Sequence, residues 1–193
     1  MLDTQNVQVP APRVPVVDGA RLMERSWYRF FSNLYNYFVD LPYGAFYDTT
    51  IQSASANTPT AITFNNTSSA RHTSISTPTS RILFAADGLT SVTFSLQLSN
   101  SAASEDDVSV WLRKNGVDVP YTGSVITVPK KHGSLDGTAI LTVNFYENFN
   151  PGDYLQLYWL TVGGTTQIKT IPASSSPAVP ASPGAVLTVS QII

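Results

Sequence analysis

The chain has no cysteine, and only 12% of its 193 residues are charged. The lack of cysteine excludes disulfide bonds, thiolate metal sites and a cysteine nucleophile. The charged fraction is about half of the usual share in globular proteins, and Ser, Thr and Asn supply the polar positions instead. This balance is typical of extracellular or virion-type β-proteins and is uncommon in cytosolic helical enzymes.

Basic charge, long apolar runs and a leader sequence are also lacking. The net charge is −2, so nucleic-acid binding would lack its main electrostatic contribution. No apolar run approaches the length of a membrane span. The segment "MLDTQNVQVPAPRVP" has neither the basic start nor the apolar centre of a secretory signal. The sequence therefore predicts no nucleic-acid partner, no membrane partner, and folding in the compartment where the chain is made.

Signs of catalysis are sparse. The two histidines, His72 and His132, lie in the polar segments "SSARHTSIS" and "PKKHGSLDG". No serine sits in a nucleophile-elbow motif, and neither a zinc-protease motif nor a phosphate loop occurs. We therefore expect no enzyme activity, no catalytic residue and no cofactor.

Two short charged runs could bind a ligand, but both are more simply interpreted as surface loops. The acidic run 105–107 could offer oxygen ligands to Ca²⁺, yet a solvated loop that guards a strand end is the favoured interpretation. The run Lys130-Lys131-His132 could contact a glycan or an acidic neighbour, and a surface loop is again favoured. The sequence thus predicts no metal site.

Three regions differ in composition along the chain. Residues 1–19 hold Pro10, Pro12 and Pro15 among valines, and closely spaced prolines block a helix and favour an extended chain. Such a segment cannot bury a core of its own, so it is either disordered or laid along another surface. The alternating valines favour a docked, extended arm.

Residues 20–42 are predicted to form an amphipathic helix, capped by Asp18 or Gly19 and ended by Pro42. Of the twelve residues from 27 to 38, seven are aromatic. A heptad seam, as in a coiled coil, is formed by Met23, Trp27, Phe30, Leu34, Tyr37 and Leu41. Phe31 and Phe38 widen this stripe on one flank. Because a lone helix of this length is marginal in water, the seam predicts a packing partner.

Residues 43–193 have the pattern of an all-β domain. Apolar residues alternate with polar ones in many short runs that are separated by turn signals, as in "SVTFSLQLS". Asn115-Gly116 is a strong hairpin signal between two such runs. A Ser/Pro-rich stretch, "PASSSPAVPASPG", is interpreted as a loop because a strand follows it. The spacing of the strands predicts a sandwich or barrel.

Some strands are apolar on both faces, which indicates a second contact besides the core. In "YLQLYWL" one face carries Leu155, Leu157 and Trp159, and the other carries Tyr154, Tyr158 and Leu160. Trp111 alternates against valines and Leu112, so we expect it to point away from the core. These patterns favour a subunit interface over scattered surface apolar residues.

Several segments resemble a known domain. "VSVWLRKNG", "FYENFNPGDYLQLYW" and the apolar C-terminal strand are similar to the jelly roll shared by tumour necrosis factor and the globular heads of complement. Two motifs, "GAF.D.T.Q.A..NT...ITFN" over 44–65 and "PRVPVVDG…WYRFF" at the N-terminus, are similar to bacteriophage virion proteins with this domain. The resemblance covers most of the chain and implies a ten-stranded jelly-roll sandwich, over 43–193, that forms a tight homotrimer.

This resemblance offers a partner for the apolar surfaces. Three sandwiches would bury apolar residues around a threefold axis, along which three helices would bundle. The expected trimer interface comprises Met23, Trp27, Phe30, Leu34, Tyr37, Trp111, Tyr158 and Trp159. The expected virion-anchoring residues are Val9, Pro10, Arg13, Val14, Pro15, Val16, Phe31 and Phe38. The alternatives for the helix are packing on its own sandwich or insertion into another virion protein.

The function implied by the resemblance is that of a phage virion structural protein, assembled in the host bacterial cytoplasm. The first hypothesis is a capsid decoration (cement) or head-fibre protein, attached to the major capsid protein by the arm and helix. The short length favours it, because long shaft repeats are absent. The alternative is a tail-associated fibre or needle-tip protein that binds a host receptor through loops near 102–107 or 174–182. A free adhesin or lectin of this fold is a third hypothesis.

Overall fold

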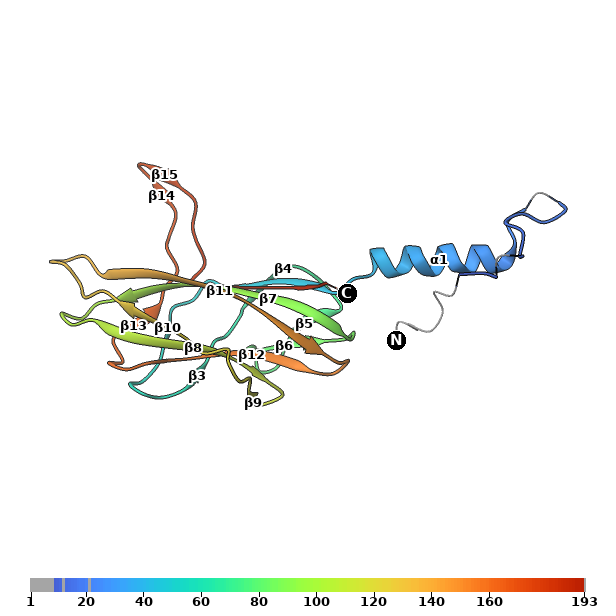
Figure 1. Cartoon of the computed structure of the whole chain (residues 1–193). Helices are drawn as coiled ribbons and strands as arrows, with labels where there is room; N and C mark the ends of the chain where they lie inside the picture. The colour runs from blue at the N-terminus through green and yellow to red at the C-terminus, as the bar shows by residue number, and fades with distance from the viewer. Residues whose placement is uncertain (1–8, 12, 21, 193) are drawn as a thin grey trace. The chain divides into compact units, whose positions relative to one another are not determined.

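A computed structural model describes residues 9–11, 13–20 and 22–192, with the backbone alone for 36–39. The chain divides into two compact units, Met1–Leu41 and Pro42–Ile193. The first contains the helix α1 (Arg25–Val39), and the second contains the strands (Figure 1). In the described ranges, no helix is both long enough and apolar enough to cross a membrane.

Helix α1 is shorter than the sequence predicts. The Asp18 carboxylate accepts the amide hydrogens of Ala20 and Leu22, at 2.8 Å each, and so closes a turn ahead of the helix. Val17 then pairs with Met23 in a β-bridge. The helix therefore begins only at Arg25, instead of at residue 20, and it ends at Val39, before Pro42.

The second unit is built from two large antiparallel sheets. The β7 sheet has the order β2 (Gln52–Ser53), β13 (Thr166–Ile168), β7 (Gly88–Asn100), β16 (Ala185–Gln191), β1 (Tyr43–Asp48) and β4 (Asn66–Arg71), with β11 (Gly137–Phe149) paired to β7. The β8 sheet has the order β10 (Ser124–Val128), β8 (Asp106–Lys114), β12 (Tyr154–Thr161), β6 (Arg81–Phe84) and β5 (Thr73–Ser76), with β3 (Thr60–Ala61) on β12 and β9 (Val117–Asp118) on β8. A separate pair consists of β14 (Ser174–Ser175) and β15 (Ala178–Val179).

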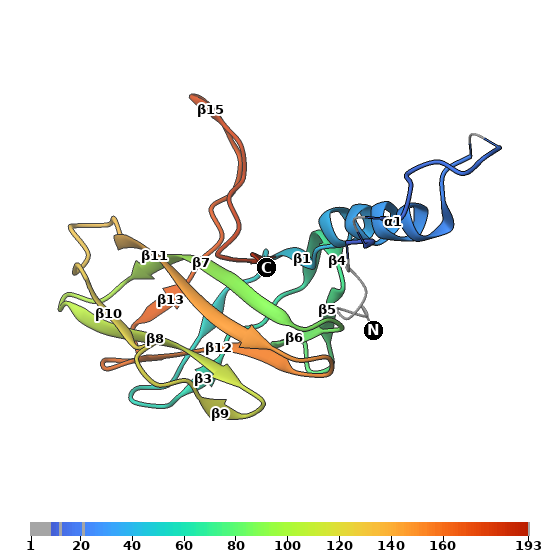
Figure 2. The same ribbon diagram turned by 45° about the vertical axis from the view of Figure 1, so that its right-hand side comes forward.

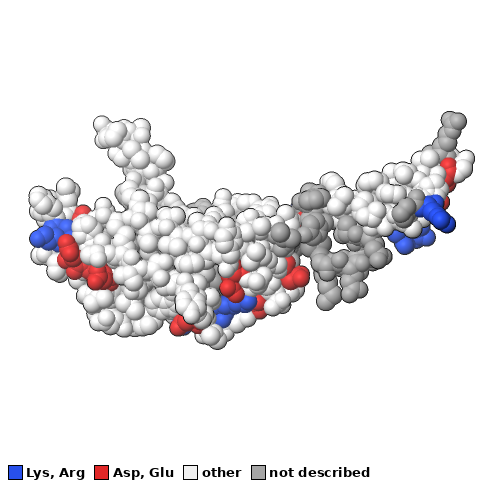
Figure 3. Space-filling model, in the orientation of Figure 1, with Lys and Arg blue, Asp and Glu red and all other residues white. Residues whose placement is uncertain are grey.

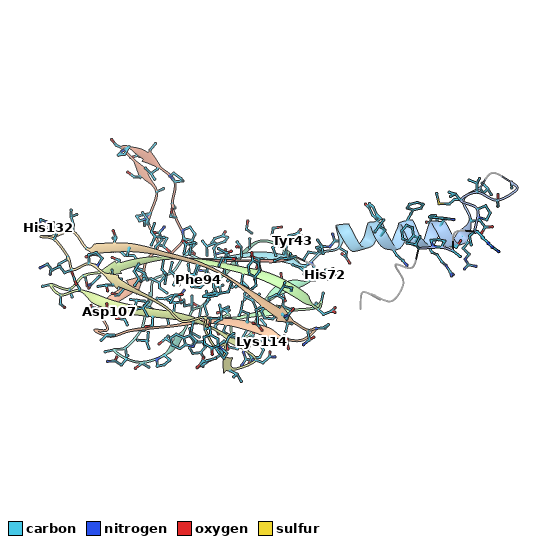
Figure 4. All side chains as sticks on the ribbon, viewed as in Figure 1. Tyr43, His72, Phe94, Asp107, Lys114 and His132 are labelled. Atoms are coloured by element: carbon cyan, nitrogen blue, oxygen red, sulfur yellow. The ribbon has the colours of Figure 1, made fainter. Side chains whose placement is uncertain are left out.

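The core lies between the two sheets, where one face of each strand is buried. Along β7 the fully or almost fully buried residues are Val92, Phe94, Leu96 and Leu98, as their period of two predicts. The β8 sheet contributes residues of the same kind, which include Val110. Figure 4 shows Phe94 between the two layers. The predicted all-β jelly-roll sandwich is confirmed.

The turn between β8 and β9 follows the sequence signal. Asn115 and Gly116 both adopt positive φ, at 51° and 82°, which is the backbone that a two-residue hairpin of this kind requires. Lys114 pairs with Val117 across the turn. Glycine adopts this conformation without steric cost, which explains its place in the turn.

Candidate functional site

On the outward face of the β7 sheet, the strands β1, β7, β11 and β16 carry no charged side chain. The strand β4, at the edge of the sheet, adds the exposed Arg71 opposite Tyr43. Register pairs Thr93 of β7 with Thr188 of β16 on one side and with Asn144 of β11 on the other. The outward positions are Tyr43, Ala45, Tyr47, Val186, Thr188, Ser190, Leu89, Ser91, Thr93, Ser95, Gln97, Thr138, Ile140, Thr142, Asn144, Tyr146 and Asn148. We call this surface the uncharged face. Depletion of charge is a mark of the centre of protein interfaces.

Polar groups on the uncharged face pair with one another. The Asn144 amide nitrogen donates to the hydroxyls of Ser91 and Thr93, at 2.7 Å each. The Thr142 hydroxyl donates to the Ser95 hydroxyl at 2.9 Å. Because these groups already have partners within the chain, removing water from the face would cost less than it would for unpaired hydroxyls.

The edge strand β11 carries core residues that reach the surface. Its inward side chains Ala139, Leu141, Val143 and Phe145 pack against the core yet stay partly exposed. The reason is that β11 has a single strand partner, β7, in the described part of the chain. The Phe145 ring approaches that of Phe94, with centroids 6.4 Å apart. An open edge with apolar residues beside an uncharged face forms one continuous surface that fits a protein partner.

Charged groups gather elsewhere on the jelly roll. Figure 3 shows them at its two ends and along the side of β8 and β9, whereas the opposite side is almost free of them in this view. The Arg113 Nε lies 2.7 Å from Asp118 Oδ1. Arg113 Nε and Trp111 Nε1 both donate hydrogen bonds to Asp118 Oδ1. These two bonds, with that of Arg113 first, lower the pKa of the Asp118 carboxyl.

Trp111 and Tyr158 belong to this charged side, on the outer surface of the β8 sheet. Trp111 Nε1 donates to Asp118 Oδ1 at 2.7 Å, and its ring centroid is 6.0 Å from that of Tyr158. The Arg113 guanidinium lies 3.7 Å from the Tyr158 ring centroid. Trp111 points away from the core, as expected, but its N–H already has a partner within the chain. Their assignment to an interface stays a prediction.

The assignment of Trp159 to an interface is wrong. Its side chain is 0% exposed within one chain, next to other core residues of β12 such as Leu157. The burial pattern of β12 shows why the prediction failed: this strand buries the face with Leu155 and Trp159 and leaves Tyr154, Tyr158 and Leu160 half-exposed. A strand that is apolar on both faces does not reveal from its sequence which face is the core.

The acidic run contains a structural hub that the sequence did not indicate. Asp106 is almost fully buried, at 2% exposure, so the expected solvated loop is wrong for this residue. Its carboxylate accepts the Thr161 hydroxyl and, at 2.7 Å, the Gly163 amide. It also accepts the hydroxyl of Thr165 at 3.1 Å and the amide of Thr166 at 3.0 Å.

These contacts determine the ionisation of Asp106. Burial alone would raise its pKa, but the hydrogen bonds, led by that of Thr161, outweigh burial and lower the pKa from 3.8 to about 2. The arrangement ties the start of β8 to the turn after β12. Its neighbour Asp107 is exposed and accepts the Thr127 hydroxyl at 2.6 Å.

The remaining candidates for chemistry are dispersed. His72 and His132 lie at opposite ends of the jelly roll (Figure 4), and Lys130, Lys131 and His132 are exposed. Within the described ranges, no three His, Cys, Asp or Glu side chains lie close enough to hold a metal ion.

In the N-terminal unit, aromatic rings cluster on the first turns of α1. The Trp27 ring stacks on Phe31 with centroids 5.9 Å apart, and Phe30 meets Phe31 edge to face at 5.3 Å. Trp27, Phe30 and Leu34 are half-buried, whereas Phe31 and Met23 are exposed. A groove of about 550 Å³ is lined by Met23, Tyr28, Phe31, Ser32 and Tyr35. The side chains of Tyr37 and Phe38, which were also predicted to make contacts, lie outside the described residues.

The segment before the helix is folded back and is not an extended arm. The Val14 carbonyl accepts the Trp27 indole N–H at 3.1 Å, and the Val16 carbonyl accepts the Glu24 amide at 3.0 Å. The extended conformation predicted for 1–19 is therefore wrong for the described residues from 13 onward. Of the expected anchoring residues here, Val9, Arg13, Pro15 and Val16 are exposed, and Pro10 and Val14 are half-buried.

Comparisons with known proteins define the fold of the second unit. No protein-family model matches the chain, and no curated protein matches it by sequence. Among solved structures, Eiger TNF from S. frugiperda is similar, with a TM-score of 0.52 and 10% identity over 80% of this chain and 94% of that one. Murine APRIL is similar at a TM-score of 0.52 and 9% identity, over 79% of this chain and 99% of that one.

At these identities the likeness establishes the fold and nothing further. The chain therefore has a jelly roll of the tumour-necrosis-factor type, as its sequence motifs implied. The uncharged face and the open edge at β11 are the surfaces that stand out on this fold. Their sequence signal was present, because Ser and Thr occupy alternate positions along β7, but it becomes visible only when four strands are aligned.

Proposed function

We propose that this chain is a structural protein of a bacteriophage virion, a trimeric capsid decoration (cement) or head-fibre protein. The support for a virion role lies in the sequence motifs of Gly44–Asn65 and of the N-terminal segment, which resemble phage proteins. The two similar solved structures do not bear on this role. Support for the trimer lies in the surface of the jelly roll.

The observation that carries the trimer is the uncharged face together with the open edge at β11. Three copies arranged around a threefold axis would bring the β11 edge of one subunit against the uncharged face of the next. Leu141, Val143 and Phe145 would then complete their burial, and each fully buried side chain of this size contributes about 1.5–3 kcal/mol. The outward positions of β1, β7, β11 and β16 carry no charge that would lose its water in this contact, and Glu147 of β11 already pairs with Lys114.

The N-terminal unit is proposed to attach the trimer to the particle. Tyr28, Phe31 and Tyr35 are exposed at 63%, 44% and 66% along one side of α1. Aromatic side chains that are spread at this density over so short a helix are typical of protein contact surfaces. The expected partner is the shell, through the major capsid protein.

Purified virions provide the first test of this function. Quantitative mass spectrometry should find the chain in a number of copies that scales with the shell subunits. A handful of copies per particle would move the protein to the tail and contradict decoration of the capsid. Absence from virions would overturn the virion role altogether.

A truncation separates trimer formation from attachment. Because residues 1–41 form a unit of their own, their deletion should leave a folded jelly roll that still sediments as a trimer. The same variant should fail to bind particles that lack the protein, whereas the full chain binds. Binding by the truncated chain would show that the jelly roll itself makes the attachment.

A further inference from the structure

A hairpin without charge stands off the β7 sheet. The fifteen residues Thr170–Gly184 contain no charged side chain. Within them β14 and β15 pair with each other, and Ile171 and Ser182 exchange two backbone hydrogen bonds of 2.9 Å at the base. Every residue from 171 to 181 is exposed. Figures 1 and 2 show that this hairpin, which we call the 171–182 arm, projects on the side of the β7 sheet, away from the β8 sheet.

An isolated two-stranded hairpin is at best marginally stable in water. The composition of the 171–182 arm also differs from that of a surface loop, since proline, alanine and Val179 occupy places where charged residues would keep a free loop hydrated. Val179 near the tip is 48% exposed. The arm therefore has the properties of a segment that packs against another surface.

A receiving surface exists at the same end of the sandwich. A cavity of about 700 Å³ lies where β7 ends, β11 begins and the arm departs. Its apolar lining includes Leu135, Ile140 and Ile171, which are 72%, 60% and 48% exposed. On its rim the Lys169 ammonium pairs with Asp136 at 2.9 Å, so the charges at the entrance already neutralise each other.

A threefold assembly would bring this arm and this cavity together. We take the axis of the proposed trimer to run along the strands, and rotation about an axis leaves height along it unchanged. The arm and the cavity lie at the same height, and the arm projects on the side of the uncharged face, where the neighbour would sit. In a ring of three, different surfaces of successive subunits meet, as a projection and a hollow do.

We infer that the 171–182 arm of one subunit inserts into the cavity lined by Leu135 and Ile140 of the next, as a clasp that links the three jelly rolls in a ring. This inference rests on the proposed trimer and adds a second contact to it. The occupant of the cavity is thus a segment of a second copy of this chain.

The absence of cysteine allows a direct test, because any disulfide must come from introduced residues. Two differently tagged chains, one with Val179→Cys and one with Leu135→Cys, are co-expressed, purified through both tags and oxidised. Non-reducing electrophoresis should show a covalent pair with both tags. A matched pair of Val179→Cys with Tyr121→Cys, at a residue that is 101% exposed in the turn before β10, should give none.

The outcomes separate the clasp from the trimer. A sample that sediments as a trimer but forms no such pair, or forms it equally with the Tyr121 control, would overturn the clasp and leave the trimer standing. A monomeric sample would contradict the proposed trimer and the clasp with it.

As a second measurement, replacing residues 173–181 by a short Gly-Ser turn should leave the sandwich folded and weaken trimerisation by about tenfold or more. Unchanged trimerisation of that variant would also overturn the clasp.

Discussion

The rings of Phe84 and Phe149 stack face to face, with their centroids 3.8 Å apart and their planes inclined by 3°. Phe84 ends β6 in one sheet and Phe149 ends β11 in the other, so the stack joins the two layers at one end of the open edge. The Lys114 ammonium lies 5.2 Å from the Phe149 ring centroid and pairs with Glu147 at 3.3 Å. The edge strand is thus fastened at its C-terminal end, while its middle has no neighbouring strand on its free side in the described chain.

Replacing Phe149 should therefore destabilise the sandwich itself. Phe149→Ala removes a ring that is only 2% exposed and should lower the free energy of unfolding by about 3–5 kcal/mol. Phe149→Leu should lose less, because it keeps most of the apolar volume. Urea unfolding at one fixed protein concentration gives the comparison. Tyr121→Ala, at a fully exposed position, is the control and should change the free energy by less than about 0.5 kcal/mol. Equal losses for Phe149→Ala and its control would contradict the role of the stack.

A single charge on the uncharged face should prevent trimer formation. Thr93 lies at the centre of that face, where Thr93→Lys would bury an ammonium that has no partner, at a cost of several kcal/mol. Sedimentation velocity should show a folded monomer for this variant. The control, Val117→Lys in β9, adds the same charge at a site that is 70% exposed on the other sheet and should remain trimeric. A trimeric Thr93→Lys chain would exclude this face as the interface.

Changes to Trp111 and Tyr158, on the outer surface of the β8 sheet, should leave the trimer intact. Trp111→Phe removes the hydrogen bond to Asp118 and should cost the fold about 1 kcal/mol, since the carboxylate is partly exposed and can be solvated instead. Its sedimentation should match that of the wild type. Dissociation of the trimer by Trp111→Phe or Tyr158→Ala would return the interface to these residues, where the sequence first placed it.

The buried carboxylate of Asp106 should make the stability of the jelly roll fall in acid. Its pKa is about 2 in the folded chain and near the ordinary 3.8 when unfolded, so the ionised form stabilises the fold above pH 3.8. This contribution, about 2 kcal/mol, is lost as the pH falls through the folded value near 2. The free energy of unfolding of the wild type, measured between pH 6 and pH 2, should fall by about this amount.

A variant identifies the group responsible for that loss. Asp106→Asn should be less stable than the wild type by about 2–4 kcal/mol at neutral pH, because its amide group must face donors such as the Thr166 N–H. Its stability should then fall less between pH 4 and pH 2 than that of the wild type. If both chains lose stability in parallel over this range, the acid sensitivity belongs to other carboxyls.

Local pattern in the sequence was enough to predict the strands and the tight turn. Phe94 and its neighbours alternate as a half-buried strand must, and Asn115-Gly116 permits the positive φ of the hairpin turn. The start of α1 was misplaced because Asp18 can cap a helix or a turn, and the pairing of Val17 with Met23 decides between them. That pairing depends on the folded chain and leaves no periodic signal.

The residues of the candidate surfaces were harder to predict from the sequence than the strands. Trp159 and Tyr158 are adjacent aromatic residues on a strand that is apolar on both faces, so only the packing of the second sheet reveals which one is buried. Asp106 finds its partners 55 to 60 positions further along the chain, which no local motif records. The sequence predicts a loop for the Ser/Pro-rich stretch because a strand follows it, whereas in the structure β14 and β15 of this stretch pair with each other.

The hydrogen bond from the Trp27 indole to the Val14 carbonyl bears on the rate of the proposed attachment. An N-terminal segment that became ordered only on contact would lose about 1–2 kcal/mol of conformational entropy per residue at that moment. Here the turn at Asp18 and the hydrogen bond of Trp27 give the described residues 13–20 internal contacts that need no partner. The proposed attachment would then resemble the docking of two preformed surfaces, so its rate should depend on collision and orientation and little on refolding of residues 13–20.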